Sequence, residues 1–526
     1  NKIKKCGVTE IDLLNYWKDD PETNVILAYL EEISDGAKFM ATAREVTETK
    51  PVVIIKSGRT TAGAKAASSH TGSLAGSDKA FEALFKQSAV LRAYDTEELF
   101  DYAVALAMMP VPTSTSPSIA IVTNAGGFGI MATDATESSG LRLAHINDDT
   151  IEKLKKVLPD TASFRNPIDL IGDATPERYV NSLEILMNDD SIKGIVVLLS
   201  PQAQTNPPEI AKEIAQLMKS KKKPVLCSFS GGNAVESSRK TLMLSGIPVY
   251  PFPERAVRAM GVLTKYAQLK QVVEKKDFET ISITKSDNLK ITKIITSVKE
   301  DLRTTLTESE AKQIANIYGI SVPKEYLAKT KDEAVKLAKK IGFPIVMKIM
   351  SPDILHKSDV GGVKLGITSE SEVKNSFDEI ILNCRTKVPK ADIRGVLITE
   401  QIEKAKEFFV GMTRDSQVGP LLAVGLGGIY VEILKDISFR VSPITRSEAR
   451  TMLEELKSYP LLTGIRGEKP SDIEAFVDVI IRISKLSVDY TEISEIDINP
   501  LFIYEKDSKN NSKQNAIALD VKMIIK

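Results

Sequence analysis

The chain contains little cysteine, tryptophan or histidine. Its 526 residues include three cysteines, one tryptophan and three histidines. The cysteines, Cys6, Cys227 and Cys384, are odd in number and far apart, which excludes a disulfide framework and a CxxC metal site. This cysteine usage fits a reducing compartment, so we expect a cytoplasmic protein.

The chain also lacks an excess of charge and a long apolar run. Lys plus Arg equals Asp plus Glu at 70 each, so no strong field attracts nucleic acid or an acidic membrane. No apolar run approaches the roughly 20 residues of a membrane span, and no secretory signal opens the chain. We therefore expect neither nucleic acid nor membrane as a partner.

Short β-branched runs alternate with amphipathic stretches along most of the sequence. This alternation is typical of parallel sheets with crossover helices, and the length predicts several domains. Residues 110–117, rich in Pro and Ser, and the polar stretch that begins near residue 274 read as linkers. Residues 496–504 and 516–525 predict a C-terminal hairpin.

His70 lies in a loop of small polar residues, directly after a predicted strand at 51–56. Gly58 and Gly63 precede it and Gly72 and Gly76 follow it, so the ring is carried on a segment with few bulky neighbours. A neutral imidazole is a good nucleophile near pH 7 and can carry a phosphoryl group. The alternative is an exposed loop histidine without chemistry, and the local sequence does not choose between them.

A second candidate lies where the predicted strand 118–123 runs into a helix. The loop there contains Asn124, Gly126 and Gly127. Such loops let backbone N–H groups and the helix N-terminus approach a phosphate. Taken alone, the motif favours the simpler interpretation, in which glycine only makes a tight turn.

The C-terminal third carries a denser set of candidates. Lys348 ends a predicted strand and can hold nucleotide phosphates, and His356 follows beside the turn Gly361-Gly362. After the predicted strand 395–399, a carboxylate can hold a ribose hydroxyl while the backbone reads an adenine edge. The residues in question are Glu400, Ile402 and Glu407.

Three polar residues interrupt the apolar strands of the predicted hairpin. Asp497 and Asn499 point to the same face because side chains alternate along a strand, and Asp520 on the partner strand can face the same point. Two carboxylates and an amide are hard oxygen ligands that suit Mg²⁺ bound to nucleotide phosphates. A solvated hairpin face is the alternative.

Together and in this order, the motifs resemble the NDP-forming acyl-CoA synthetases, relatives of succinyl-CoA synthetase. The resemblance covers nearly the whole chain and adds the segments Asn166-Pro167-Ile168-Asp169 and Gly231-Gly232-Asn233-Ala234. It implies an α/β multidomain fold, with two flavodoxin-like parallel-sheet domains followed by an ATP-grasp domain. The implied order is an α-subunit-like ligase domain with the histidine loop at 1–112, a flavodoxin-like β-subunit-like domain at 113–273, a linker at 274–300 and the ATP-grasp domain at 301–526.

The resemblance also implies a role for each candidate. His70 would be the phosphohistidine, and Glu31 the carboxylate that orients it. The nucleotide would be held at its phosphates by Lys348, at adenine by Glu400 and Ile402, and at ribose by Glu407. Mg²⁺ would be bound by Asn499 and Asp520, with Asp497 supporting the histidine near the nucleotide, His356 acting as a second phosphoryl carrier, and Asn124, Gly126 and Gly127 forming a helix N-terminus beside the phosphohistidine.

The implied reaction converts a carboxylic acid, CoA and ATP into acyl-CoA, ADP and phosphate, reversibly, through an acyl phosphate. The acid would be acetate or a short hydroxy acid such as 4-hydroxybutyrate or 3-hydroxypropionate. Alternatives are a succinate-type ligase and a non-catalytic relative that senses nucleotide or acyl-CoA.

Fused family members begin with a CoA-binding domain, which should precede Asn1. The start at Asn rather than Met also suggests a fragment. We therefore expect most of the CoA site to lie outside this sequence. A homo-oligomer is expected from the family.

Overall fold

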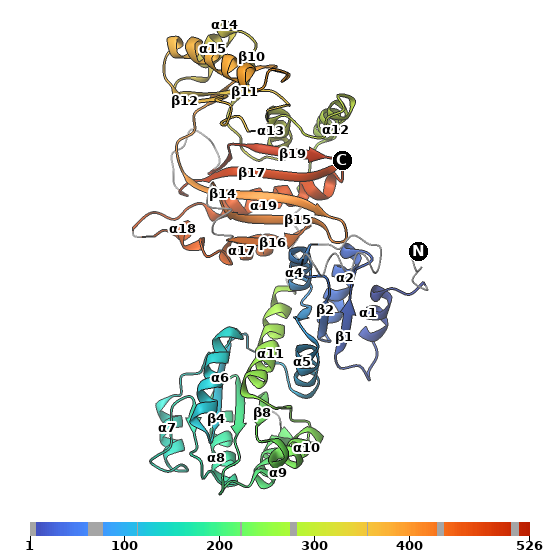
Figure 1. Ribbon diagram of the computed structural model, residues 1–526, viewed down its shortest axis with the longest axis vertical. Helices are drawn as coiled ribbons and strands as arrows, with labels where there is room; N and C mark the ends of the chain where they lie inside the picture. Colours follow the sequence, from blue (N-terminus) through green and yellow to red (C-terminus); the bar gives the residue numbers. More distant parts are fainter. Residues whose placement is uncertain are drawn as a thin grey trace. The chain divides into compact units, whose positions relative to one another are not determined.

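The computed structural model describes residues 7–60, 77–112, 114–220, 223–273, 281–354, 356–428, 436–465, 467–506 and 515–526. The chain divides into two compact units, Asn1–Lys275 and Lys276–Lys526, which Figure 1 colours from blue to green and from yellow to red. Within the described ranges, no helix is both long and apolar enough to cross a bilayer.

The first unit begins with a small parallel sheet of order β1-β2-β3. Its strands are β1 (Ile26–Leu30), β2 (Val52–Lys56) and β3 (Leu91–Ala93), and its helices are α1 (Glu10–Lys18), α2 (Gly36–Thr47), α4 (Asp78–Gln87) and α5 (Thr96–Met108). Strands β1 and β2 and helices α4 and α5 fit the predicted alternation of short strands with helical stretches, and β2 confirms the strand predicted at 51–56. Each buries its apolar residues, as the pattern requires.

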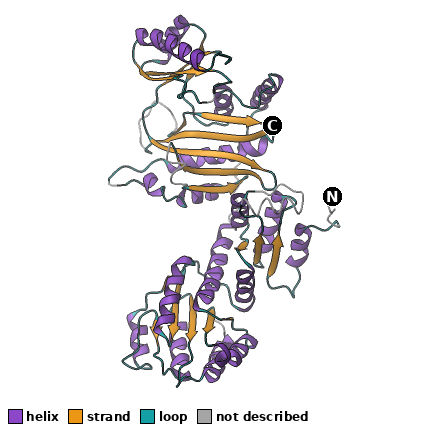
Figure 2. Ribbon diagram, in the orientation of Figure 1, coloured by secondary structure: helices purple, strands orange, loops and turns teal. Residues whose placement is uncertain are grey.

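A larger parallel sheet follows, of order β5-β4-β7-β8-β9, with β6 pairing β4. The strands are β4 (Ser118–Thr123), β5 (Arg142–Leu143), β6 (Ile168–Asp169), β7 (Gly194–Leu199), β8 (Val225–Phe229) and β9 (Val249–Tyr250). The helices are α6 (Gly126–Ser138), α7 (Asp148–Lys155), α8 (Pro176–Met187), α9 (Pro207–Leu217), α10 (Glu236–Leu244) and α11 (Pro253–Val273). Figure 2 shows these strands enclosed by helices.

Both faces of this sheet are buried, which explains the continuous apolar strands. Ala120 and Val122 of β4 pack in a core that α7 to α10 complete, whereas Ile119 and Ile121 face a second core with α6 and α11. That second core also includes Val53 and other residues of the small sheet. Helix α11 therefore packs against both sheets and holds the first unit together.

The second unit contains two antiparallel sheets. The smaller has the order β10-β13-β11-β12, and the larger has the order β16-β15-β14-β17-β18, with β19 pairing β17. The strands are β10 (Glu325–Ala328), β11 (Ile345–Met350), β12 (Val363–Ile367), β13 (Gly395–Glu400), β14 (Lys406–Asp415), β15 (Gly419–Leu426), β16 (Ile437–Val441), β17 (Ile493–Ile503), β18 (Ala516–Ala518) and β19 (Val521–Ile525). The predicted C-terminal hairpin is confirmed, because β17 pairs antiparallel with β18 and β19.

Helices cover these sheets, α14 and α15 lying against the smaller one (Figure 1). The helices of the unit are α12 (Lys285–Glu300), α13 (Glu308–Ile317), α14 (Lys331–Ile341), α15 (Glu370–Lys387), α17 (Arg446–Glu454), α18 (Tyr459–Thr463) and α19 (Ile473–Asp489). Helix α13 begins with a capping box: Thr307 caps the helix and Glu310 bonds back to it.

Helix α12 differs from the expected linker at 274–300. Its residues Ile291, Ile295 and Val298 are buried in the core of the second unit. The spacing of these residues, four and then three, is that of one helix face, but the lysines and polar residues between them disguise it. Residues 285–300 therefore belong to the second unit.

Asn166 provides a test of what holds the larger parallel sheet. Its side-chain oxygen accepts from Ile121 N at 3.0 Å, and its nitrogen donates to Ile119 O at 2.8 Å and Ala144 O at 3.1 Å. Asn166→Ala would remove the side-chain partner of Ile121 N, whereas Ile119 O would keep the bond that it accepts from Ala144 N at 2.8 Å. We therefore expect the free energy of unfolding, measured by urea denaturation, to fall by about 1–3 kcal/mol. Asn188→Ala is the control, because that exposed side chain makes one bond, to Glu184 O. Equal losses in the two variants would contradict this account.

Candidate functional site

Five charged side chains meet in the second unit, between α13, β10, β11 and the β11–β12 loop. At the centre, Glu308 Oε1 accepts from Lys312 Nζ and from Lys348 Nζ, each at 2.8 Å. Its second oxygen, Oε2, accepts from Lys357 Nζ at 2.7 Å. Lys312 Nζ also donates to Glu325 Oε2 at 2.7 Å. We call these five residues the lysine cluster.

Local structure places each member of the cluster. Glu308 and Lys312 are four residues apart on α13 and therefore share one helix face. Lys348 extends from β11 and Glu325 from β10. Lys357 lies in the loop between β11 and β12. Residues distant in sequence thus converge because α13, whose apolar residues pack in the core of the large sheet, directs Glu308 and Lys312 toward β11 and β10.

The cluster is largely removed from water. The side chains of Glu308 and Lys312 are each 2% exposed, and those of Lys348 and Lys357 are 17% and 16% exposed. Burial by itself would raise the pKa of the Glu308 carboxyl, but the three lysines outweigh burial and hold that pKa well below its usual range. Three ammonium groups facing two carboxylates leave one net positive charge, so the cluster is suited to an anion.

The predicted glycine turn shapes the loop that carries Lys357. Gly361 has φ of +71°, which favours glycine, and its amide donates to Ser358 O at 3.0 Å. Gly362 N donates to Lys357 O at 2.8 Å, and a Cβ there would come within 2.7 Å of Ile349 Cγ2. Both amides are thus used inside the loop, where they hold Lys357. His356 is exposed in the same loop.

The segment predicted to border adenine connects the two sheets. At the end of β13, Glu400 N donates to Lys324 O at 2.9 Å, and Gln401 Oε1 accepts from Gly366 N at 2.7 Å. Ile402 packs against a small cluster that includes Phe502 and Tyr504 of the large sheet. Glu400 and Ile402 therefore lie where the chain passes from one sheet to the other.

Glu407 and Asn499 meet at Gly428. Gly428 N donates to Asn499 Oδ1 at 3.2 Å, and a Cβ built on Gly428 would lie 3.0 Å from Glu407 Oε2. Gly428 also has φ of +69°. The predicted ribose and magnesium ligands are therefore close to each other on neighbouring strands β14 and β17.

Asp520 lies opposite Asn499, as the sequence predicts. The register pairs Ile498 with Val521 and Leu501 with Ala518, so residues 499–500 face residues 519–520. Burial raises the pKa of Asp497, with Lys522 lowering it and the carboxylates of Glu495 and Asp520 raising it further. Crowded carboxylates of this kind suit a cation.

The described ranges contain no group of three or more His, Cys, Asp or Glu side chains arranged to hold a metal. The predicted Mg²⁺ ligands, Asn499 and Asp520, would therefore supply one amide oxygen and one carboxylate. Nucleotide phosphates would complete its ligands.

The predicted sites of the first unit are described only in part. His70 lies outside the described residues. Glu31 is half-buried just after β1 and accepts from Tyr29 Oη at 3.5 Å, while Ser57 N, just after β2, donates to Leu30 O at 3.0 Å. Glu31 and the start of the segment leading to His70 thus share the carboxyl edge of the small sheet.

The loop at the start of α6 is tightly held. The Asn124 side chain donates to Ser200 O at 2.8 Å and accepts from Ser200 N at 2.9 Å, so it ties β4 to β7. Gly126 begins the helix, and a Cβ there would lie 3.3 Å from Asp169 Oδ2, whereas Gly127 faces open space. Of Asn124, Gly126 and Gly127, the asparagine is therefore bonded to β7, and the two glycines leave room for a ligand at the helix N-terminus.

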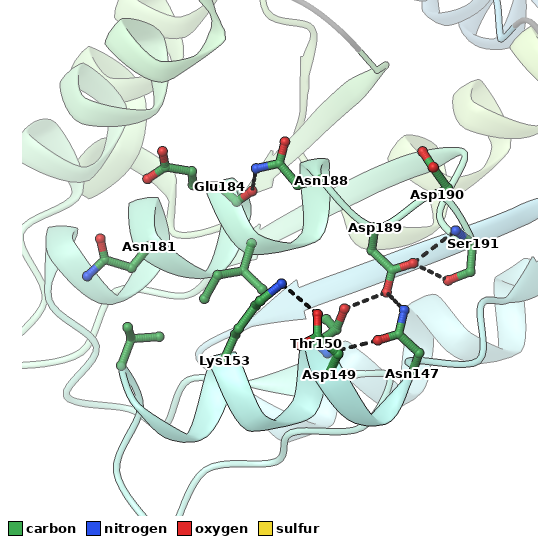
Figure 3. A pocket seen from close by; sticks show the side chains of 12 residues that line it. Asn147, Asp149, Thr150, Lys153, Asn181, Glu184, Asn188, Asp189, Asp190 and Ser191 are labelled. Carbon is green, nitrogen blue, oxygen red and sulfur yellow. Dashed lines mark hydrogen bonds and ion pairs between the residues drawn. The ribbon is translucent and has the colours of Figure 1, made fainter.

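A cleft of about 690 Å³ in the first unit lies elsewhere (Figure 3). Its buried carboxylate, Asp189, accepts from Asn147 Nδ2, Thr150 Oγ1 and Ser191 Oγ, which gives it a structural role. The cleft opens before β7, at the amino end of that strand, whereas open α/β sheets bind ligands at the carboxyl ends. None of the predicted site residues lines it.

Four members of the lysine cluster, Glu308, Lys312, Glu325 and Lys357, were not predicted from the sequence. Only Lys348 was predicted. The i to i+4 spacing of Glu308 and Lys312 beside a capping box was a usable signal, but the pairing of Glu308 with Lys357 and of Lys312 with Glu325 depends on tertiary structure.

Three family models match the chain: "Succinyl-CoA ligase like flavodoxin domain" at residues 4–106, "Ligase-CoA domain" at 119–274 and "ATP-grasp domain" at 297–525. The first model is thus named for flavodoxin and the second for ligase, whereas we expected a ligase domain at 1–112 and a flavodoxin-like domain at 113–273. Acetate–CoA ligase [ADP-forming] I of Archaeoglobus fulgidus is 43% identical over 501 residues, which are 95% of this chain and 71% of that protein. The chain belongs to the ADP-forming acyl-CoA ligase family.

Two further relatives support this membership. The 4-hydroxybutyrate–CoA ligase [ADP-forming] of Nitrosopumilus maritimus is 39% identical over 95% of this chain and 71% of its own length. Acetate–CoA ligase [ADP-forming] I of Pyrococcus furiosus has separate subunits. Its β subunit is 48% identical over 45% of this chain and 98% of the subunit, and its α subunit is 42% identical over 51% of this chain and 57% of the subunit. This ligase chain joins segments similar to both.

The raised pKa of Asp497 predicts how stability depends on pH. A carboxyl with a higher pKa in the folded than in the unfolded state contributes stability that is present below the unfolded pKa and is lost as pH rises through the folded pKa. Asp497→Asn should therefore increase the free energy of unfolding at pH 7 without nucleotide or Mg²⁺. The advantage should vanish below about pH 4. Urea titrations at both pH values test this, and a larger advantage at the lower pH would contradict it.

Proposed function

We propose that this ligase activates a short carboxylic acid: acid, CoA and ATP are converted into acyl-CoA, ADP and phosphate, reversibly. The observation that carries the proposal is the lysine cluster, whose net positive charge lies beside the predicted adenine segment. The acetate and 4-hydroxybutyrate specificities in the names of its relatives support acetate or a short hydroxy acid as substrate.

In the nucleotide site, Lys348 and Lys357 hold the phosphates. Both are slightly exposed, and an ammonium group has three N–H donors, so each can donate to a phosphate oxygen while it stays bonded to Glu308. Glu400 and Ile402 border the adenine, and Glu407 binds the ribose. Asn499 and Asp520 would hold Mg²⁺, which would screen the phosphate charge, and Asp497 would support the His70 imidazole when it takes up the phosphoryl group.

His70 carries the phosphoryl group between the nucleotide and the acid. The imidazole attacks the γ-phosphorus of ATP, and ADP leaves. The carboxylate oxygen of the acid then attacks the phosphorus of phosphohistidine, giving an acyl phosphate and free His70. Finally the CoA thiolate attacks the acyl carbon, and phosphate leaves with the bonding electrons. The phosphohistidine and acyl phosphate intermediates together divide one difficult transfer into easier steps.

Three groups assist this carrier. Glu31 orients the imidazole and stabilises its charged form. The N-terminus of α6, at Gly126 and Gly127, offers N–H groups to the phosphoryl oxygens. His356, exposed beside Lys357, accepts the phosphoryl group as a second carrier near the nucleotide.

Phosphate labelling tests the proposal. After incubation of the full polypeptide with Mg²⁺ and radiolabelled ATP, we expect acid-labile, base-stable phosphate on the protein, as phosphohistidine requires. His70→Ala should remove the label, because the carrier imidazole is gone. His145→Ala is the matched control, because His145 is exposed in the first unit and has no proposed role.

The other outcomes are also informative. Label that persists in His70→Ala but is lost when His356→Ala is added would place the first acceptor in the ATP-grasp domain. No label in any variant, despite ADP binding, would contradict the ligase mechanism and leave a nucleotide sensor.

A further inference from the structure

We infer that Glu308 is a positioning residue, which holds Lys348 and Lys357 in the direction that phosphoryl transfer requires. The inference rests on the proposed nucleotide site and adds a residue that binds no substrate itself. Among the described residues, Glu308 is the carboxylate that both lysines contact, one through each of its oxygens, at 2.8 and 2.7 Å.

Glu308 is itself firmly placed. It lies in the first turn of α13, directly after the capping residue Thr307, whose capping box with Glu310 fixes the helix start. Its side chain is 2% exposed, and Lys312 from the same helix shares its Oε1. The two lysines approach from β11 and from the β11–β12 loop, so one rigid carboxylate aligns two separate elements.

Two effects of Glu308 oppose each other. Its negative charge offsets part of the attraction between the lysines and a phosphate. Against this, a free lysine side chain loses up to about 2 kcal/mol of rotamer freedom when it is fixed, and Glu308 fixes two before nucleotide arrives. The three lysines outnumber the two carboxylates, so the cluster stays net positive. We therefore expect the positioning of the lysines to affect the transfer rate more than the negative charge of Glu308 does.

Glu325 provides a matched control within the same cluster. It is also a buried carboxylate, with a side chain 9% exposed, and it contacts Lys312 at 2.7 Å. Its other oxygen, Oε1, has no partner among the described residues. Removing either carboxylate changes the cluster charge equally, but only Glu308→Gln releases Lys348 and Lys357.

The first experiment measures the rate of phosphoenzyme formation at saturating Mg²⁺ and ATP in the full polypeptide. Glu308→Gln should slow it about 30-fold, because misdirected groups commonly lose one to two orders of magnitude, and Glu325→Gln by less than about 3-fold. Lys357→Met should slow the parent enzyme, but it should add little in the Glu308→Gln background, because Glu308 acts through that lysine. Equal slowing by both Gln variants, or fully additive losses, would overturn the inference.

A second experiment requires no nucleotide. Amine-reactive labelling read by mass spectrometry should show Lys348 and Lys357 modified about 10-fold faster in Glu308→Gln, as expected when about 1.4 kcal/mol of restraint is lost. Their rates should change less than about 2-fold in Glu325→Gln. Unchanged rates in Glu308→Gln would show that Glu308 does not hold the lysines.

The two experiments separate the inference from the proposed function. Faster labelling in a protein that never becomes phosphorylated would reject the ligase mechanism while retaining the restraint of the lysines by Glu308. Phosphorylation that is equally fast in the parent and in a folded Glu308→Gln variant would reject the positioning role of Glu308 while retaining the ligase mechanism. Circular dichroism checks folding, and Glu308→Asp serves as a milder variant, with partial loss expected, if the Gln variant fails to fold.

Discussion

The buried carboxylate of Glu308 is the constraint on which the second unit depends. A charge removed from water is strongly unfavourable unless it is paired, and three lysines pair it here. Those lysines come from α13, from β11 and from the loop that follows β11. The arrangement of helix, strand and loop is therefore coupled to the electrostatics of a single site, and the excess positive charge gives that site an affinity for anions.

In the proposed mechanism, the two units handle phosphate by different means. The first is built on parallel strands, whose carboxyl ends place Glu31 and the start of α6 at sheet edges, where backbone N–H groups are available. The second is built on antiparallel sheets and uses lysine side chains, with carboxylates and an amide across β17, β18 and β19. A reaction that moves a phosphoryl group between two substrates needs two such environments, and a carrier histidine suits that division.

Glycines in both units serve geometry before chemistry. Gly428 fits between Glu407 and Asn499, and Gly361 and Gly362 fold the loop that brings Lys357 beneath Glu308. Similarly, the side chain of Asn124 makes its hydrogen bonds to the backbone of Ser200. In each case the sequence motif suggests direct contact with a ligand. In the structure, these residues instead shape the backbone that carries the functional group.

Patterns among neighbouring residues were enough to predict the strands and helices of the first unit, the C-terminal hairpin and the family, because periodicity and motif order are local properties of the chain. They also placed Asn499 opposite Asp520, since hairpin register follows from alternation along two adjacent strands. They did not reveal that α12 is buried, nor that Glu308 and Glu325 balance three lysines. Both features depend on tertiary packing, because an ion pair between residues far apart in the sequence forms only when helix and sheet bring them together, and no local pattern encodes that distance.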